Sequence, residues 1–261
     1  MSSLPRRGAV AAALSLCLAL AACGGGTSSK YDGSTVDGQV LMDATAPVIS
    51  SGAVCMYAIA NGQGNPLNFS VSPPTGTGTL LTPGCISTDA QGQFSQALPN
   101  FYGPVLVQIT GGSYLSAATH STQSLTPLAA TNASLQAVVF VGGGSTVNVQ
   151  VTPLTTIATA IANTMPGGLT MSNYAAASAK AAAEFQLGAI DIANTLPVAG
   201  DAQDKVLFGI EQYLALPPGS SDDAGGADLL NWNTGVLAQM SSDFTTSYNA
   251  INGTSASFSF Y

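Results

Sequence analysis

The chain has 261 residues, of which 46% are hydrophobic and only 7% are charged, and its formal net charge is −8 at pH 7. Five basic residues cannot neutralise a row of phosphates, so the composition excludes nucleic acid as a partner. Low charge with many small residues is also typical of disordered chains, but the hydrophobic content and the strand patterns described below indicate a folded core.

The first 22 residues have the pattern of an export signal. Two arginines precede an apolar run from Ala9 to Ala22, which is too short for a comfortable transmembrane helix of about 20 apolar residues. The run closes on Leu20-Ala-Ala-Cys, which resembles the lipobox of bacterial lipoproteins. The resemblance implies cleavage before Cys23, acylation of its thiol and its new amino group, and stable membrane anchoring by more than one chain. A secretory signal followed by a chance cysteine is the alternative.

The residues that follow the cysteine bear on location. In the lipoproteins that this segment resembles, an Asp after the lipidated cysteine often favours the inner membrane, whereas this chain has Gly24. We therefore expect a cell-envelope protein of the outer membrane rather than the inner one, facing the periplasm or the cell surface. Residues 23–34 are expected to form a flexible lipidated tether because Gly24–Ser29 contains only Gly, Ser and Thr. The expected membrane contact is the lipid on Cys23.

The four cysteines divide by position. Cys17 would leave with the signal and Cys23 would carry lipid, which leaves Cys55 and Cys85 as a pair in an oxidising compartment. A disulfide between them would close a loop of about 30 residues and stabilise the fold by about 3–4 kcal/mol. Two buried free thiols are the alternative. Two cysteines and the single His120, without CxxC spacing, fall short of a zinc site, so no metal or cofactor is expected.

From residue 35 to about residue 152, short strand-like runs alternate with Gly, Pro and Asn. The clearest run places Val105, Val107 and Ile109 on one face and Gln108 and Thr110 on the other. This period predicts an antiparallel β-sandwich in which one face of each sheet is exposed to solvent. Its size matches an immunoglobulin-like or transthyretin-like sandwich. The predicted strands are Val36–Met42, Ala53–Ala60, Leu67–Val71, Gln93–Leu98, Val105–Thr110, Leu135–Val141 and Thr146–Val151.

The order of motifs in residues 35–115 resembles the carboxypeptidase regulatory-like (prealbumin-like) modules of exported bacterial proteins. The motifs are Val36-Asp-Gly-Gln-Val, Ser51-Gly-Ala-Val-Cys-Met-Tyr, Thr88-Asp-Ala-Gln-Gly-Gln-Phe and Gly103-Pro-Val-Leu-Val-Gln-Ile. The third motif is a plausible turn because Asp89 can bond the backbone ahead of it and Gly92 can take a positive φ. The resemblance implies a non-catalytic accessory module, and it assigns a ligand contact to no position in this sequence.

After Val151 the hydrophobic period changes to that of helices. Thr152-Pro153 is typical of an N-cap followed by proline at the first helical position. Thr170 is expected to cap a second helix and Asp201 a third. A fourth helix is expected after Asp222-Asp223, where a stripe of apolar residues begins.

The fold class predicted from these elements is α+β, with a sandwich at 35–152 followed by a helical region at 153–261. The segment Ser255–Tyr261 alternates small polar with aromatic residues. It is consistent with an added strand that pairs with the sandwich, with a frayed end, or with truncation of a longer chain.

No catalytic residue is predicted. His120 lies in a polar, loop-like stretch, and no Gly-x-Ser-x-Gly elbow accompanies it. Glu184 and Glu211 lie on separate predicted helices and could meet in space, but solvated helix faces explain them equally well. The candidate binding surface is Phe101-Tyr102, an aromatic pair in a predicted exposed loop.

The function expected from the sequence is that of a membrane-anchored, non-enzymatic binding or structural module of the cell envelope, with a carbohydrate or protein partner. The alternative is a hydrolase or an accessory subunit of an exported hydrolase. A cleft with a perturbed carboxylate pair would favour the hydrolase, and a flat or aromatic-lined surface would favour binding.

Overall fold

The computed structural model describes residues 33–48, 52–59, 80–99, 101–125, 135–215, 229–230, 232 and 234–260. Several predicted features lie outside the described residues, namely the signal, Cys23, the tether up to residue 32, the strand Leu67–Val71 and the helix start at Asp222-Asp223. Residues 31–261 form one compact unit.

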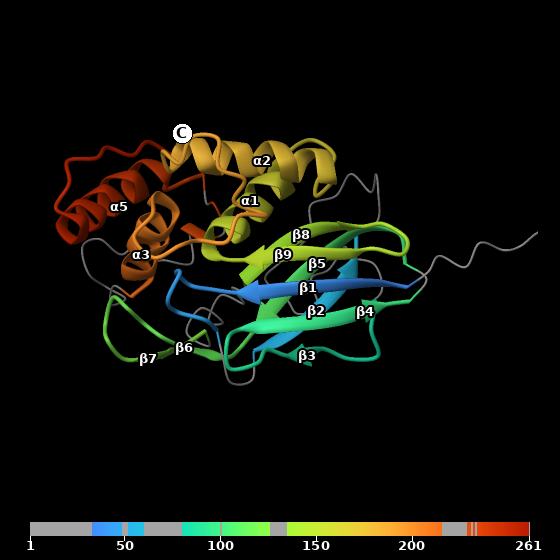
Figure 1. Cartoon of the computed structure of the whole chain (residues 1–261). Helices are drawn as coiled ribbons and strands as arrows, with labels where there is room; N and C mark the ends of the chain where they lie inside the picture. Colours follow the sequence, from blue (N-terminus) through green and yellow to red (C-terminus); the bar gives the residue numbers. More distant parts are fainter. Residues whose placement is uncertain are drawn as a thin grey trace, which may run out of the picture. The chain divides into compact units, whose positions relative to one another are not determined.

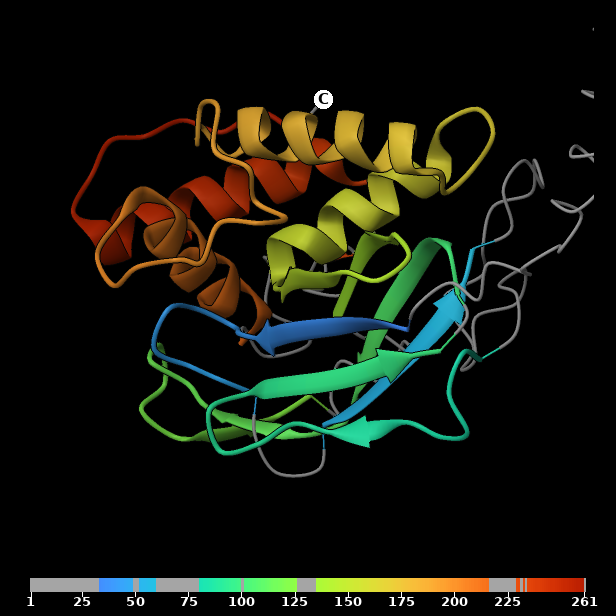
Figure 2. The same cartoon turned by 45° about the vertical axis from the view of Figure 1, so that its right-hand side comes forward.

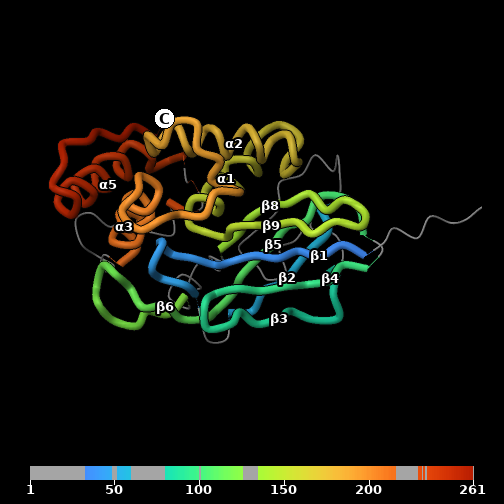
Figure 3. Tube along the Cα trace, in the orientation of Figure 1, coloured from blue at the N-terminus to red at the C-terminus, as the bar shows by residue number. Residues whose placement is uncertain are grey.

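The strands of this unit form two main sheets (Figure 1). One sheet has the order β4-β1-β9, the other has the order β3-β2-β5-β8, and β6 pairs with β7 in a separate hairpin. Most neighbours are antiparallel as predicted, but β1 and β9 run parallel although about 110 residues separate them, which the trace in Figure 3 follows. The strands are β1 (Ser34–Val40), β2 (Ala53–Ala58), β3 (Ile86–Ser87), β4 (Gln93–Leu98), β5 (Gly103–Thr110), β6 (Ser113–Leu115), β7 (Thr122–Ser124), β8 (Leu135–Val141) and β9 (Thr146–Val151).

The two sheets enclose a hydrophobic core, as the sandwich prediction requires. The three-stranded sheet contributes Val36, Phe94 and Val149, while the four-stranded sheet contributes residues such as Val107 and Val139. Along β4 the burial alternates, so the outer face of the three-stranded sheet remains open to solvent. The predicted fold class, α+β with a sandwich followed by helices, is therefore confirmed.

The helices follow the strands in the chain. The first three begin at the predicted caps, whereas α5 begins after Val236 without a side-chain cap. The side chains of Thr152, Thr170 and Asp201 each accept a hydrogen bond from a backbone N–H in the first turn, and Pro153 occupies the first position of α1. The helices are α1 (Pro153–Thr164), α2 (Met171–Glu184), α3 (Ala202–Leu214) and α5 (Leu237–Asn252). Within the described ranges, no helix combines the length and the hydropathy that a membrane span requires.

The helical layer packs through α1 and α2 on the outer face of the four-stranded sheet, so the expectation that this face is open to solvent is wrong (Figure 2). Leu106 and Val138 from this face belong to one core with Leu154 and Phe185 from the helical region. Gln108, predicted to face solvent, is 1% exposed for the same reason. The helices carry apolar stripes that need a partner, and this sheet supplies it, so the unit has three layers.

The C-terminal segment belongs to the helical layer. Residues 254–260 form no strand, and Phe258 and Phe260 pack against Phe185 and Phe244. The alternation of small and aromatic residues therefore reflects two buried rings among the helices, and the option of a strand paired with the sandwich is wrong for these residues.

Candidate functional site

The predicted disulfide is present. Cys55 in β2 and Cys85 just before β3 are bonded, with a Cα–Cα distance of 4.5 Å and a sequence separation of 30. The bond continues the antiparallel register in which Val54 pairs with Ile86, so it holds the two-residue strand β3 against β2. That strand supplies one wall of the groove described next.

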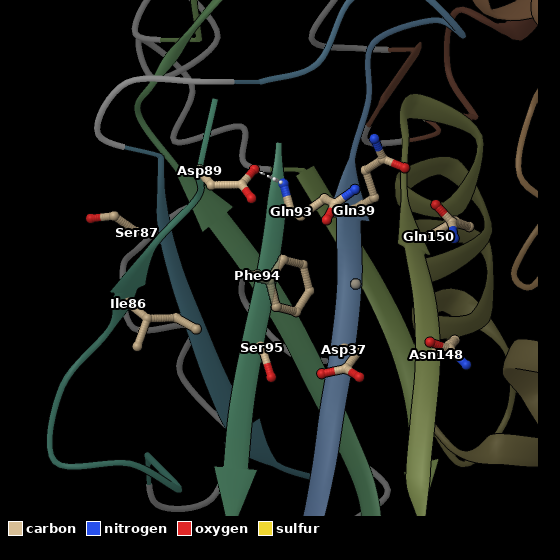
Figure 4. Close-up of a pocket in the computed structure, with 11 residues that line it drawn as sticks. Asp37, Gln39, Ile86, Ser87, Asp89, Gln93, Phe94, Ser95, Asn148 and Gln150 are labelled. Atoms are coloured by element: carbon tan, nitrogen blue, oxygen red, sulfur yellow. Dashed lines mark hydrogen bonds between the residues drawn. The ribbon is translucent and has the colours of Figure 1, made fainter. Parts of the chain in front are cut away.

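A groove of about 700 Å³ lies on the open face of the three-stranded sheet and extends to β3 (Figure 4). The strand register arranges its outward polar side chains in two rows across β4, β1 and β9. One row is Ser95–Asp37–Asn148, and the other is Gln93–Gln39–Gln150. Neighbouring strands are about 4.8 Å apart, and successive outward residues of one strand are about 6.5–7 Å apart. The two rows therefore form a nearly flat polar grid.

The wall beside the grid comes from β3 and the turn that follows it. Ile86, Ser87 and Asp89 line this side. The Asp89 carboxylate accepts the backbone N–H of Gln93 at 2.8 Å, and Gly92 has φ +72°. The turn chemistry predicted for Asp89 and Gly92 is thus present, and it fixes where β4 begins in relation to β3.

The floor of the groove depends on a glycine. Gly38 of β1 pairs with Phe94 of β4, and the Phe94 ring lies across the space that a side chain at Gly38 would occupy. The ring is only 6% exposed and belongs to the sandwich core. Phe94 therefore supports the grid from below and offers little aromatic surface for stacking.

The groove presents acceptor oxygens and negative charge. Asp37 Oδ1 and Gln150 Oε1 are buried from solvent and accept no hydrogen bond. Gln39 is already engaged, because its Nε2 donates to the carbonyl oxygen of Gln91 at 2.9 Å. The lining of the groove contains two carboxylates, Asp37 and Asp89, and no basic residue. The arrangement suits a ligand that donates hydrogen bonds and carries no negative charge.

The aromatic pair predicted from the sequence divides between two environments. Tyr102 is 57% exposed and packs edge-on against Phe140, with ring centroids 5.2 Å apart and an interplanar angle of 88°. Phe101 is partly buried against the sandwich core. Neither residue lines the polar groove.

The other polar residues considered in the sequence have separate surroundings. His120 is exposed in the turn between β6 and β7 with φ +53°. Glu184 forms an ion pair with Lys180 at 2.8 Å, whereas Glu211 lies beside Asp43. In the part of the chain that the structure describes, no group of three or more His, Cys, Asp and Glu side chains could hold a metal ion.

Asp43 and Glu211 form a buried carboxyl pair that the sequence did not predict. Burial, together with the neighbouring Asp43, raises the pKa of Glu211 to about 8, against opposing effects of Ser116 and the Ala118 backbone. Two adjacent buried carboxyl groups cannot both be ionised at little cost, and Glu211 therefore keeps its proton at neutral pH. Burial also raises the pKa of Tyr114, and the charges of Glu211 and Asp43 add to this effect.

The sequence contained a partial signal for the polar grid. Asn148 and Gln150 occupy the polar positions of a strand with clear alternation, and Asp37 and Gln39 occupy the same positions in another strand. Nothing local to either strand indicates that the two are neighbours, because parallel pairing leaves no turn signal between them.

Comparison with known proteins adds little. No protein-family model and no curated protein matches the chain. One solved structure, a proposed carbohydrate-binding protein from Pseudomonas aeruginosa, is 15% identical and is matched over 47% of this chain and 90% of its own, with a TM-score of 0.24. A similarity this low carries no argument about function.

Proposed function

We propose that the protein is a non-enzymatic binding module of the cell envelope, anchored through lipid on Cys23, whose polar groove takes a neutral, hydroxyl-rich ligand of the carbohydrate class. The observation that carries the proposal is the pair of acceptor oxygens on adjacent strands, Asp37 Oδ1 and Gln150 Oε1, which are buried and accept no hydrogen bond. A buried polar group without a partner is costly, and ligand hydroxyls would supply the missing donors.

The composition of the grid supports this class of ligand. Amide side chains both donate and accept hydrogen bonds, as sugar hydroxyls do, and four of the six grid residues are Asn or Gln. The two carboxylates in the lining disfavour anionic ligands. A protein partner is the weaker candidate, since protein interfaces centre on exposed aromatic or arginine anchors and Phe94, the aromatic residue in the lining, is almost fully buried.

The buried carboxyl pair does not favour the hydrolase alternative. Glycosidases place two carboxylates on either side of an accessible scissile bond. Asp43 and Glu211 are 1% and 0% exposed, and neither lines the polar groove. We assign the pair a structural role between the sandwich and α3.

Binding is tested on an array of neutral, amino and sulfated glycans, followed by calorimetric titration of the best ligand. We expect saturable binding of neutral glycans, and a loss of about tenfold or more in affinity for Asp37→Ala and Gln150→Ala. The matched control is Thr146→Ala, which alters an exposed position of the same strand outside the groove and should leave the affinity unchanged. Absence of binding to every neutral glycan, or equal loss in all three variants, would overturn the proposal.

The anchor is tested separately by the intact mass of the protein extracted from bacterial membranes. We expect a mass that begins at Cys23 and includes acyl chains, in outer-membrane fractions, and a soluble, unacylated product for Cys23→Ser. An unacylated mass for the unaltered protein would refute the anchor and leave the groove proposal standing.

A further inference from the structure

A second groove, of about 610 Å³, lies between α2, the strands β8 and β9, and the segment 188–194. Its lining is mainly apolar and shares no residue with the polar groove. Val147 and Val149 of β9, at the edge of the sandwich core, contribute to the lining of this second groove, whereas Asn148 and Gln150 of the same strand belong to the polar grid. The alternation of one strand thus serves two grooves of opposite character.

The far wall of the second groove is held in place by its own hydrogen bonds. The Gln150 N–H donates to the Ala193 carbonyl at 3.3 Å, which ties the segment to the edge of β9. Asp191 accepts the Ala193 N–H at 3.1 Å and the Asn194 side-chain amide at 2.8 Å. Ile192, fully buried, anchors the segment in the helical core. The groove is therefore preformed, which lowers the entropic cost of binding.

Two buried hydroxyl groups lie in this apolar lining. Tyr174 and Ser178, one turn apart on α2, are 3% and 8% exposed. Their hydroxyl groups lie near each other and near the Val138 carbonyl, but neither has a hydrogen-bond partner of normal geometry. A ligand that exchanges a hydrogen bond with either hydroxyl would remove an unfavourable buried group.

The charge at the rim limits the ligand further. Asp191 is the only charged residue in the lining, so a carboxylate or phosphate would be repelled. Both oxygens of this carboxylate already accept hydrogen bonds within the turn, so a cationic head group would gain little from it. At one end, Phe140 is 40% exposed and packs against Tyr102, which adds aromatic surface to the apolar wall.

We propose that this second groove, lined by α2, β8, β9 and residues 188–194, is a binding site for a small neutral amphiphile. The apolar body of the ligand lies along the valines and Phe140, and its single polar group exchanges hydrogen bonds with Tyr174 and Ser178. The volume lies within the usual range of about 300–1,000 Å³ for small-molecule sites.

The test titrates the ¹⁵N-labelled protein with three probes of equal chain length, 1-octanol, octanoate and octylammonium, and follows amide shifts. We expect saturable shifts with 1-octanol, confined to residues 138–140, 147–149, 171–179 and 188–194. Octanoate and octylammonium should each bind at least about tenfold more weakly. Tighter binding of either charged probe, or 1-octanol shifts spread over other surfaces, would overturn the proposal.

Variants distinguish binding of 1-octanol in the groove from non-specific binding elsewhere on the protein. Ala179→Phe places a ring in the groove and should weaken 1-octanol binding by about tenfold or more, because it fills the space that the ligand needs. The matched control is Ala176→Phe on the exposed face of the same helix, outside the lining, which should bind as the unaltered protein does. Ser178→Ala should weaken binding by about threefold to tenfold. Equal affinity of the two phenylalanine variants would refute the site.

Discussion

Glu211 of α3 and Asp43 of the connection after β1 lie beside each other in the interior, with side chains that are 0% and 1% exposed. The same surface of α3 makes a second contact with this connection, because the Ala44 N–H donates to the Asp204 carboxylate at 2.9 Å. The carboxyl group of Asp43 also accepts hydrogen bonds from the backbone and the hydroxyl of Thr45. The helical layer and the sandwich are thus joined by polar contacts as well as by the apolar core.

The pair predicts a pH-dependent stability. The pKa of Glu211 is raised from 4.5 to about 8, so its contribution to the free energy of unfolding is complete below pH 4.5 and is lost as the pH rises to about 8. The decline should not exceed about 1.4 kcal/mol per pH unit. Urea unfolding at several pH values, compared between the protein and Glu211→Gln, measures it. The variant should gain stability over the unaltered protein as the pH rises from 4.5 to 8.

The control for this comparison is Glu184→Gln, which removes a carboxylate from a partly exposed ion pair with Lys180. Its effect should stay within about 0.5 kcal/mol across the same range, because surface pairs contribute little. If Glu211→Gln and Glu184→Gln show the same pH dependence, the assignment of a retained proton to Glu211 is wrong.

Loss of the disulfide should destabilise the protein and loosen the wall of the polar groove. Replacing Cys55 and Cys85 together by Ala opens a loop of 30 residues, for which the chain-entropy estimate is a cost of about 3–4 kcal/mol. Urea unfolding measures the cost, and exchange of the Ile86 and Ser87 amides reports whether β3 stays on β2. Unchanged exchange at these amides would contradict the role of the bond in holding β3.

A side chain at position 38 should clash with the ring that supports the groove. Gly38→Ala places a Cβ inside the Phe94 ring, so we expect a destabilisation of about 1–3 kcal/mol. Phe94→Leu in the same chain should recover part of this loss because the smaller side chain leaves room for the methyl group. A double-mutant cycle by chemical denaturation measures the coupling, and strict additivity of the two changes would refute the contact.

The C-terminal segment should contribute strongly to the stability of the helical layer. Phe260 is fully buried among Phe185, Phe244 and Trp232, so Phe260→Ala should cost about 3–5 kcal/mol in unfolding free energy. Ser259→Ala, at the exposed neighbouring position, is the control and should change stability by less than about 0.5 kcal/mol. Similar values for the two variants would contradict the packing.

Local patterns predicted most of the elements. The runs Gln93–Leu98, Leu135–Val141 and Thr146–Val151 coincide with β4, β8 and β9, since β4 and β9 alternate with period two and β8 is a short, nearly continuous apolar run. The caps Thr152 and Thr170 also follow from local chemistry, because the capping side chain and the backbone N–H that donates to it lie in the same turn. The short strands β3, β6 and β7 were not predicted, because two or three residues show no period.

The sequence could not show which strands and helices pack against one another. Gln108 occupies a position that reads as solvent-facing, and its burial follows only from the helices that cover β5. Likewise, the sequence predicts only that Glu211 is an acidic residue on an amphipathic helix. Its proximity to Asp43 depends on how α3 packs against the connection after β1. The polar grid required the same kind of information, because Asp37 and Asn148 become neighbours only through the parallel pairing of β1 and β9.

The pairing of β1 with β9 also sets an order of events during folding. β1 lies between β4 and β9, and its parallel partner β9 is made about 110 residues later in synthesis. Contacts between segments so distant in sequence form slowly, because the intervening chain must first be brought together. β1 can pair with β4, which precedes β9 in the chain, but its second edge stays open until Val151 is available. A chain halted before β9 would expose that edge, and the proposed ligand would find only two of the three strands that form its grid.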